Sequence, residues 1–96
     1  MTVITLHEAE VEFHESVIHY EAKEPGLGIR FRDEVAAVMD WISHNPEVPR
    51  LKRKLYRRVN LRVFSHYATY IIREDTIWVV AIAHAHRRPE FWLGRI

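Results

Sequence analysis

The amino-acid sequence predicts an α+β domain in which an antiparallel helical hairpin packs on a small, mostly antiparallel sheet. Apolar residues recur at helical spacing in the first half of the chain and at strand spacing in the second half. Between the two helical stretches, the segment from Pro25 to Gly28 predicts a short reversal. The 96 residues suffice for one domain, residues 1–96, in the order strand, helix, helix and three strands.

The first helix is expected to follow a short β-branched run at residues 1–4. Thr5 to Glu8 has the pattern of a capping box, which predicts that the Thr5 hydroxyl caps the helix. A core-facing stripe spans about 80° of the helix surface and consists of Ala9, Phe13, Val17 and Tyr20. A weaker apolar strip lies nearly opposite and consists of Val11, Ile18 and Ala22. These side chains either contact a partner, or flank the second helix, or lie singly in solvent.

The second helix is expected to end before Asn45-Pro46. It carries a similar stripe, which consists of Leu27, Phe31, Val35, Val38 and Ile42. From Leu55 the pattern becomes alternating, which predicts a strand that continues to Phe64. Two more strands are expected at residues 66–73 and 77–85, joined by a turn at residues 74–76. The last strand is apolar on both faces, so we expect it to be central in the sheet. Residues 90–96 are expected to form one closing helical turn.

The net charge of +1 conceals an uneven distribution. Residues 1–48 contain three basic and ten acidic residues, a net charge of −7, and residues 49–96 contain eleven basic and three acidic residues, a net charge of +8. Such asymmetry either indicates a polyanionic partner or means that the two halves neutralise each other in the fold.

Several classes of protein are excluded by composition. The chain contains no cysteine, which excludes disulfides, a thiolate nucleophile and zinc sites that require sulfur. No stretch approaches the roughly 20 apolar residues of a membrane span, and no signal peptide is recognisable. We therefore expect a soluble, cytoplasmic protein without membrane contact. No third ligand accompanies His84 and His86, so neither a metal site nor another cofactor is expected.

Four segments together resemble the toxins of the RelE/ParE superfamily of bacterial type II toxin–antitoxin modules. They are the first helix at Ala9 to Tyr20, Pro25-Gly26-Leu27-Gly28-x-Arg30-Phe31, Arg57-Arg58 ahead of Val63-Phe64, and Ala81-x-x-His84-x-x-Arg87-Arg88-Pro89-x-x-Trp92. The resemblance covers nearly the whole chain through the order and spacing of these segments. It implies the strand, helix, helix and three-strand fold reached above, a growth-inhibiting activity and a cognate antitoxin as partner.

The resemblance leaves two activities, inhibition of DNA gyrase by ParE-like toxins and ribosome-dependent cleavage of mRNA by RelE-like toxins. RelE-like nucleases resemble one another in a strong positive charge and often in a C-terminal tyrosine, whereas this chain has a charge of +1 and no tyrosine after Tyr70. We therefore expect a ParE-like gyrase inhibitor that acts by binding, without catalysis. The expected target-binding residues are Arg57, Arg58, Arg87, Arg88 and Trp92. Alternatively, Trp92 caps the core and Arg87 and Arg88 pair with the acidic hairpin.

The alternative function is a ribosome-dependent endoribonuclease. His84 and His86 share a strand face and could exchange protons, with Arg58, Arg62 and Arg87 holding the phosphate. In the structural alternative, His84 is a strand-end histidine bonded to the backbone and His86 is merely exposed. A third possibility is a degenerate toxin that only forms a complex with its antitoxin to regulate their operon.

The antitoxin is expected to contact both the hairpin strip and the basic part of the chain. Val11, Ile18 and Ala22 are the predicted antitoxin-binding residues on the hairpin. A further basic stretch is either a solvated loop or an attractive surface for an acidic antitoxin tail, and it consists of Arg50, Lys52, Arg53 and Lys54.

Overall fold

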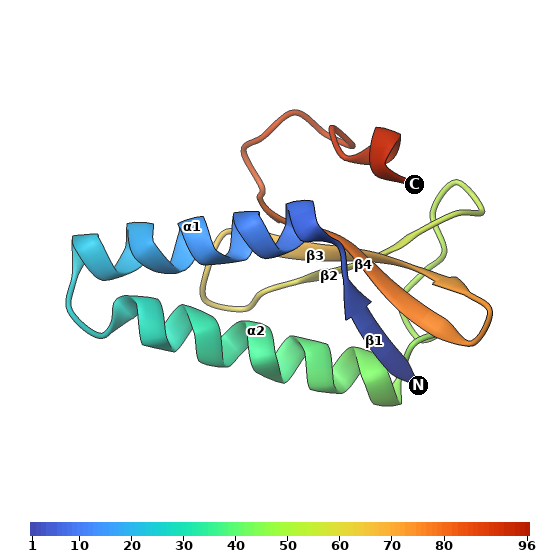
Figure 1. Ribbon diagram of the computed structural model, residues 1–96, viewed down its shortest axis with the longest axis horizontal. Coiled ribbons are helices and arrows are strands. Elements are labelled where there is room, and N and C mark those ends of the chain that lie inside the picture. The colour runs from blue at the N-terminus through green and yellow to red at the C-terminus, as the bar shows by residue number, and fades with distance from the viewer.

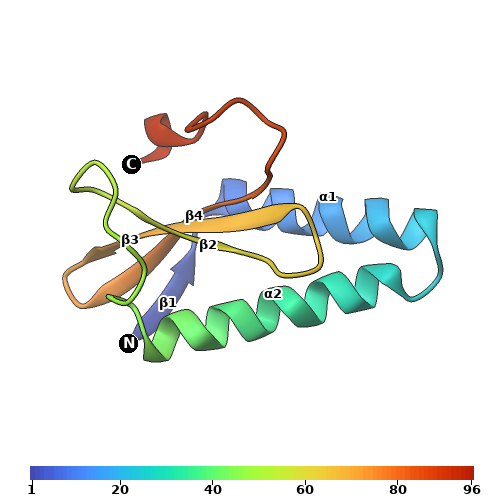
Figure 2. The same cartoon turned by 180° about the vertical axis from the view of Figure 1, so that it is seen from behind.

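The computed structural model describes all 96 residues and has the predicted order of elements. Two helices lie side by side and cover one face of a sheet. Figures 1 and 2 show this arrangement from opposite sides. The elements are β1 (Thr2–Thr5), α1 (His7–Lys23), α2 (Leu27–His44), β2 (Arg57–Asn60), β3 (His66–Arg73), β4 (Thr76–His84) and a short 3-10 helix, η1 (Leu93–Arg95). Neither α1 nor α2 combines the length and apolar character that crossing a membrane requires.

The sheet has four strands in the order β1-β4-β3-β2. β1 runs parallel to β4, and the β4–β3 and β3–β2 pairs are antiparallel, so the sheet is mostly antiparallel as predicted. The central position expected for the last strand is confirmed, because β4 lies between β1 and β3. Glu74 and Asp75, both with positive φ, form the tight turn between β3 and β4.

The helical hairpin is formed by the two predicted stripes. Ala9 on α1 and Phe31, Val35 and Ile42 on α2 are buried in one core with the helix-facing side chains of the sheet. The link between the helices is held from α1, because the Glu21 carboxylate accepts hydrogen bonds from the amides of Gly26 (2.9 Å) and Gly28 (3.0 Å). A Cβ at Gly28 would lie 2.6 Å from the Val17 carbonyl oxygen, so only glycine permits this close approach of the helices.

A second core covers the opposite face of the sheet. It contains Tyr56, Tyr67, Ile71, Val80, Ala81, Ala83 and Trp92. The chain after β4 supplies Trp92 and returns across this face, as the red segment in Figures 1 and 2 shows. β4 is covered on both faces, which explains why both faces are apolar.

The predicted capping box is wrong. Thr5 belongs to β1, where it pairs with Val79, and α1 begins at His7 with Leu6 as its N-cap and no side-chain cap. The β-branched run thus extends through Thr5, and pairing with the buried strand β4 outweighs local capping.

The predicted strand over residues 55–64 is also wrong in extent, since β2 comprises only Arg57–Asn60. Beyond Asn60 the Glu34 carboxylate of α2 accepts hydrogen bonds from the backbone amides of Arg62 and Val63. The chain therefore leaves the ladder and turns towards α2 while Leu61 and Phe64 become buried. A contact with a distant helix, which alternation cannot reveal, ends the strand.

Candidate functional site

The C-terminal segment, residues 85–96, is anchored by Trp92. The indole is 2% exposed, stacks edge-on against Tyr56 with 4.5 Å between ring centres, and donates from Nε1 to the Tyr67 hydroxyl at 3.0 Å. The prediction that Trp92 lies at an outer edge with the arginines is therefore wrong. The structure shows the alternative stated above, in which Trp92 caps the core.

A carboxylate on α1 holds the same segment from the other side. Glu12 accepts two hydrogen bonds from the Arg95 guanidinium, at 3.0 and 2.9 Å, and lies 3.5 Å from Nη1 of Arg87. Its Oε1 also accepts from the amide of Ile82 at 3.2 Å. Arg87 thus pairs with the acidic hairpin, as the structural alternative predicted, whereas Arg88 does not, and the second arginine at Glu12 is Arg95, which was not predicted.

Arg87 and Arg88 differ in what remains free for a partner. The Arg87 guanidinium stacks over the Phe91 ring, 3.7 Å from its centre, and its side chain is still 54% exposed. Arg88 is exposed and forms no ion pair or side-chain hydrogen bond within the chain. The segment therefore presents two guanidiniums on a backbone that Trp92 and Arg95 fix.

Arg57 and Arg58 point to opposite faces of β2. Arg57 donates to the carbonyls of Glu47 (3.0 Å) and Pro49 (2.7 Å), so it fastens the loop that follows α2. Arg58 lies over the Tyr67 ring at 3.8 Å, on the face that Trp92 covers. The five predicted target-binding residues therefore do not form one patch. Period-two alternation contained this information, because adjacent strand residues face opposite ways.

A pocket of about 380 Å³ lies between α1 and the ends of β3 and β4 and gathers histidines. It is lined by Glu12, Glu15, Ser16, His19, His66, Ile82, Ala83, His84 and Arg87. The ring centres of His66 and His84 are 5.0 Å apart, and those of His84 and His86 are 4.6 Å apart. His84, His86 and Arg87 were predicted from the sequence, whereas His19 and His66 were not, because strand register sets the pairing of His66 with His84 across the sheet.

The protonation of these histidines is constrained. Burial first, then the neighbouring charges of His84 and His19, lowers the pKa of His66 to about 4. Burial, followed by the charge of His86, also lowers the pKa of His84. Nδ1 of His84 accepts a hydrogen bond from the His86 amide at 3.0 Å, so the neutral ring carries its proton on Nε2. In this state His84 offers a donor to the pocket and no free base.

The arginines expected to assist these histidines lie elsewhere. Arg58 is on the opposite face of the sheet, over Tyr67. Arg62 lines a different cavity of about 250 Å³ between α2 and β2, with Trp41 and Val59. Of the five residues in the predicted nuclease constellation, only His84, His86 and Arg87 lie together.

The predicted antitoxin-binding strip is exposed on α1. Val11 is 39% and Ile18 69% exposed, and Ala22 is exposed as well. None of the three belongs to either core. Burial in a core therefore does not explain the apolar character of the strip.

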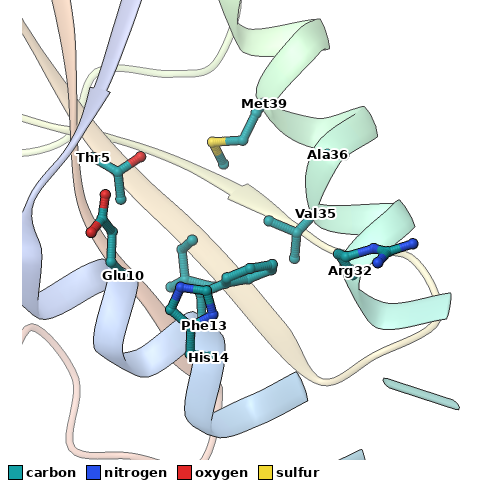
Figure 3. Close-up of a pocket in the computed structure, with 9 residues that line it drawn as sticks. Thr5, Glu10, Phe13, His14, Arg32, Val35, Ala36 and Met39 are labelled. Atoms are coloured by element: carbon teal, nitrogen blue, oxygen red, sulfur yellow. The ribbon is translucent and has the colours of Figure 1, made fainter. Parts of the chain in front are cut away.

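A further pocket, about 360 Å³, opens between the two helices and was not predicted. Phe13 of α1 with Val35 and Met39 of α2 forms an apolar wall, and Glu10, His14 and Arg32 lie around it, as Figure 3 shows. The helical stripes correctly identify the apolar residues as core. The stripes cannot show that the helices leave a gap at this level.

No group of three or more histidine and acidic residues in the chain has an arrangement that could hold a metal ion.

Comparison with known proteins gives a structural likeness without sequence support. No protein-family model and no curated protein sequence matches the chain. A solved structure from the chromosomal ParDE toxin–antitoxin (TA) system of P. aeruginosa matches with a TM-score of 0.67 and 13% identity. The match covers 88% of this chain and 95% of that chain.

The chain has a ParE-like fold. The likeness spans the helical hairpin and the sheet, so the fold expected from the resemblance in the sequence is confirmed. At 13% identity, it identifies the scaffold and not the activity.

Proposed function

We propose that this protein is the toxin of a type II toxin–antitoxin module, and that it inhibits DNA gyrase by binding and is neutralised by a cognate antitoxin. The main support is the likeness, over 88% of the chain, to a chain from a ParDE toxin–antitoxin system. The four sequence segments that resemble this superfamily provide support of a different kind.

The target-binding surface in this proposal is the anchored C-terminal segment with its two available guanidiniums. Arg87 is held by Glu12 and Phe91, and Arg88 projects without a partner in the chain. Guanidiniums on a fixed backbone bind carboxylates without a further loss of backbone conformational entropy. Trp92 contributes by fixing the segment and not by contact with the target.

The endoribonuclease remains the second candidate because the histidine pocket is a specific observation in its favour. RNA cleavage through the 2′-hydroxyl needs a base, an acid and a cation near the phosphate. The pocket has Arg87 as a cation. However, both ring nitrogens of His66 are engaged in hydrogen bonds with Ser16 and Tyr20, and His84 presents a donor at Nε2. His19 is the exposed imidazole that remains to act as a base. No hydrogen bond within the chain orients His19 for this role, and this places the function second.

Induced expression in bacteria separates the candidates. Gyrase inhibition predicts filamentous cells with DNA damage, whereas ribosome-dependent cleavage predicts a rapid arrest of translation with cut transcripts. Unimpaired growth would identify a protein that only forms a complex with its antitoxin. A His84→Gln, His19→Gln double variant that keeps full toxicity supports the binding mechanism, and loss of toxicity in a folded double variant supports the nuclease.

A further inference from the structure

The loop between α2 and β2 combines exposed cations with exposed apolar side chains. We call residues 50–55 the basic loop; its cations are Arg50, Lys52, Arg53 and Lys54. Leu51 is 45% and Leu55 38% exposed, and nearby Val48 is 68% exposed. Figures 1 and 2 both show this yellow-green loop beside the red C-terminal segment.

The backbone of the basic loop is fixed. The amide of Lys52 donates to the Tyr56 carbonyl (2.8 Å), and the amide of Tyr56 donates to the Lys52 carbonyl (3.1 Å). Tyr56 is 5% exposed, packs against Trp92, and donates from its hydroxyl to Glu90 at 2.6 Å. The exposed side chains of the loop thus stand on a closed turn tied to the second core, so a partner meets a largely preformed surface.

Unusual backbone conformations converge at this point. Arg53 (φ 53°), Lys54 (φ 55°) and Glu90 (φ 56°) are left-handed although none is glycine, and Arg53 Nε contacts Glu90 Oε2 at 2.6 Å. Arg53 and Lys54 are the central residues of a tight turn that the Leu55 amide closes by donating to the Lys52 carbonyl at 2.9 Å, as Glu74 and Asp75 are in the β3–β4 turn, so Glu90 alone lies outside such a turn. The left-handed conformation of Glu90 accompanies the hydrogen bonds that its carboxylate accepts from Arg53 and Tyr56, which tie the basic loop to the C-terminal segment.

Most of the cations are uncommitted. Arg53 pairs with Glu90, but Arg50, Lys52 and Lys54 form no ion pair. A partner's carboxylates can therefore reach three positive charges without displacing an internal acid. The leucines indicate the kind of polyanion, because a nucleic-acid backbone contacts cations but gains nothing from exposed leucines.

We propose that the basic loop is a docking surface for an acidic polypeptide segment that also carries apolar side chains. Charge attraction would speed the encounter, and burial of Leu51, Leu55 and Val48 would supply affinity. The proposal rests on the proposed function in one respect, which is that the segment belongs to the neutralising antitoxin. Docking here would extend over Glu90 to the C-terminal segment, so one partner chain can cover both surfaces.

The test is fluorescence anisotropy with three labelled probes of equal charge: a peptide in which glutamate pairs alternate with leucines, a polyglutamate peptide, and single-stranded DNA. We expect the glutamate–leucine peptide to bind about tenfold more tightly than the other two. Lys52→Glu with Lys54→Glu should weaken its binding about tenfold or more. Leu51→Ser with Leu55→Ser should abolish its preference over polyglutamate. Arg30→Glu with Arg73→Glu makes the same charge change at exposed sites elsewhere and should have no effect.

Equal binding of all three probes, or tighter binding of DNA, would overturn the proposal. It would also be overturned if Arg30→Glu with Arg73→Glu weakened peptide binding as much as Lys52→Glu with Lys54→Glu does. Circular dichroism verifies that each variant is folded. If Lys52→Glu with Lys54→Glu unfolds the protein, Lys52→Ser with Lys54→Ser is used in its place. Gyrase inhibition measured with the same variants keeps the two proposals separate. Wild-type protein that binds the peptide without inhibiting gyrase refutes only the target, and protein that inhibits gyrase without binding the peptide refutes only the docking surface.

Discussion

His66 connects the sheet to α1 through a neutral imidazole. Its Nδ1 lies 3.2 Å from the Tyr20 hydroxyl and its Nε2 lies 3.3 Å from the Ser16 hydroxyl. The ring is 6% exposed and packs against Phe31, with 4.9 Å between ring centres. Burial opposes its protonation, as do the charges of His84 and His19, so acid should weaken this connection.

The fold should therefore lose stability as the pH falls from about 6.5 towards 4. In this range the unfolded chain binds a proton at His66 and the folded chain, with a pKa of about 4, does not. The contribution is fully present above pH 6.5, and its loss amounts to at most about 3 kcal/mol. Urea denaturation at several pH values measures it. His66→Gln should reduce the loss of stability between pH 6.5 and 4, whereas His7→Gln, at an exposed site, should not. An unchanged pH dependence in His66→Gln would contradict the role of His66.

Arg88 tests the proposed target surface without disturbing the fold. Because its side chain has no partner in the chain, Arg88→Glu should leave stability nearly unchanged but reduce gyrase inhibition about tenfold or more. Arg73→Glu, also exposed, is the charge control. Trp92→Phe should preserve inhibition while reducing stability by about 2–3 kcal/mol, because it removes the hydrogen bond to Tyr67 and leaves a cavity in the second core. Full inhibition by Arg88→Glu would exclude this residue from the surface.

The C-terminal segment and α1 behave as connected elements through Glu12, which is 13% exposed. Glu12→Gln should reduce the free energy of unfolding by about 2 kcal/mol, since it removes charged hydrogen bonds to Arg95. Hydrogen exchange should show faster opening of residues 93–96. Glu15→Gln, which has no ion pair, is the matched control. Unchanged protection of the segment would show that Trp92 alone anchors it.

The apolar strip on α1 is the predicted antitoxin contact. Val11→Asp with Ile18→Asp should weaken the toxin–antitoxin complex about a hundredfold, because charges would replace buried apolar contacts. Ile29→Asp, at a 51% exposed position on α2, is a control of similar character. Calorimetry with the purified antitoxin measures the affinity, and an unchanged affinity would remove the hairpin from the interface.

The helices and the central strand were predictable because burial imposes a period on one segment at a time. The stripe containing Phe31 and Val35 and the two-sided apolar run in β4 each correspond to an observed buried surface. The end of β2 was not predictable, since it depends on Glu34 of α2 reaching the amides of Arg62 and Val63. Local patterns carry no information about such contacts.

The candidate site was less predictable than the fold for the same physical reason. Arg87 and Arg88 were correctly placed on one segment, but the Glu12–Arg95 pair joins residues 83 positions apart. His66 and His19 approach His84 only through strand register and helix packing. The burial of Trp92 depends on how the chain returns after β4, which its own sequence does not specify.

The whole molecule places an acidic hairpin on one side of the sheet and basic segments at the other side and at the edge. Glu12 with Arg87 and Arg95, and Glu34 at the amides after β2, connect the two halves. Several cations remain unpaired, and they include Arg50, Lys52, Lys54 and Arg88. The opposite charges of the two halves thus serve both the fold and, in our proposal, its partners.

A supercoiling assay with purified DNA gyrase, relaxed plasmid and ATP tests the proposed function most directly. We predict that this protein at micromolar concentration blocks supercoiling, that Arg88→Glu does so far less well, and that Arg73→Glu acts like the wild type. Normal supercoiling in the presence of the wild-type protein, together with cleavage of ribosome-bound transcripts, would show that it is an endoribonuclease instead.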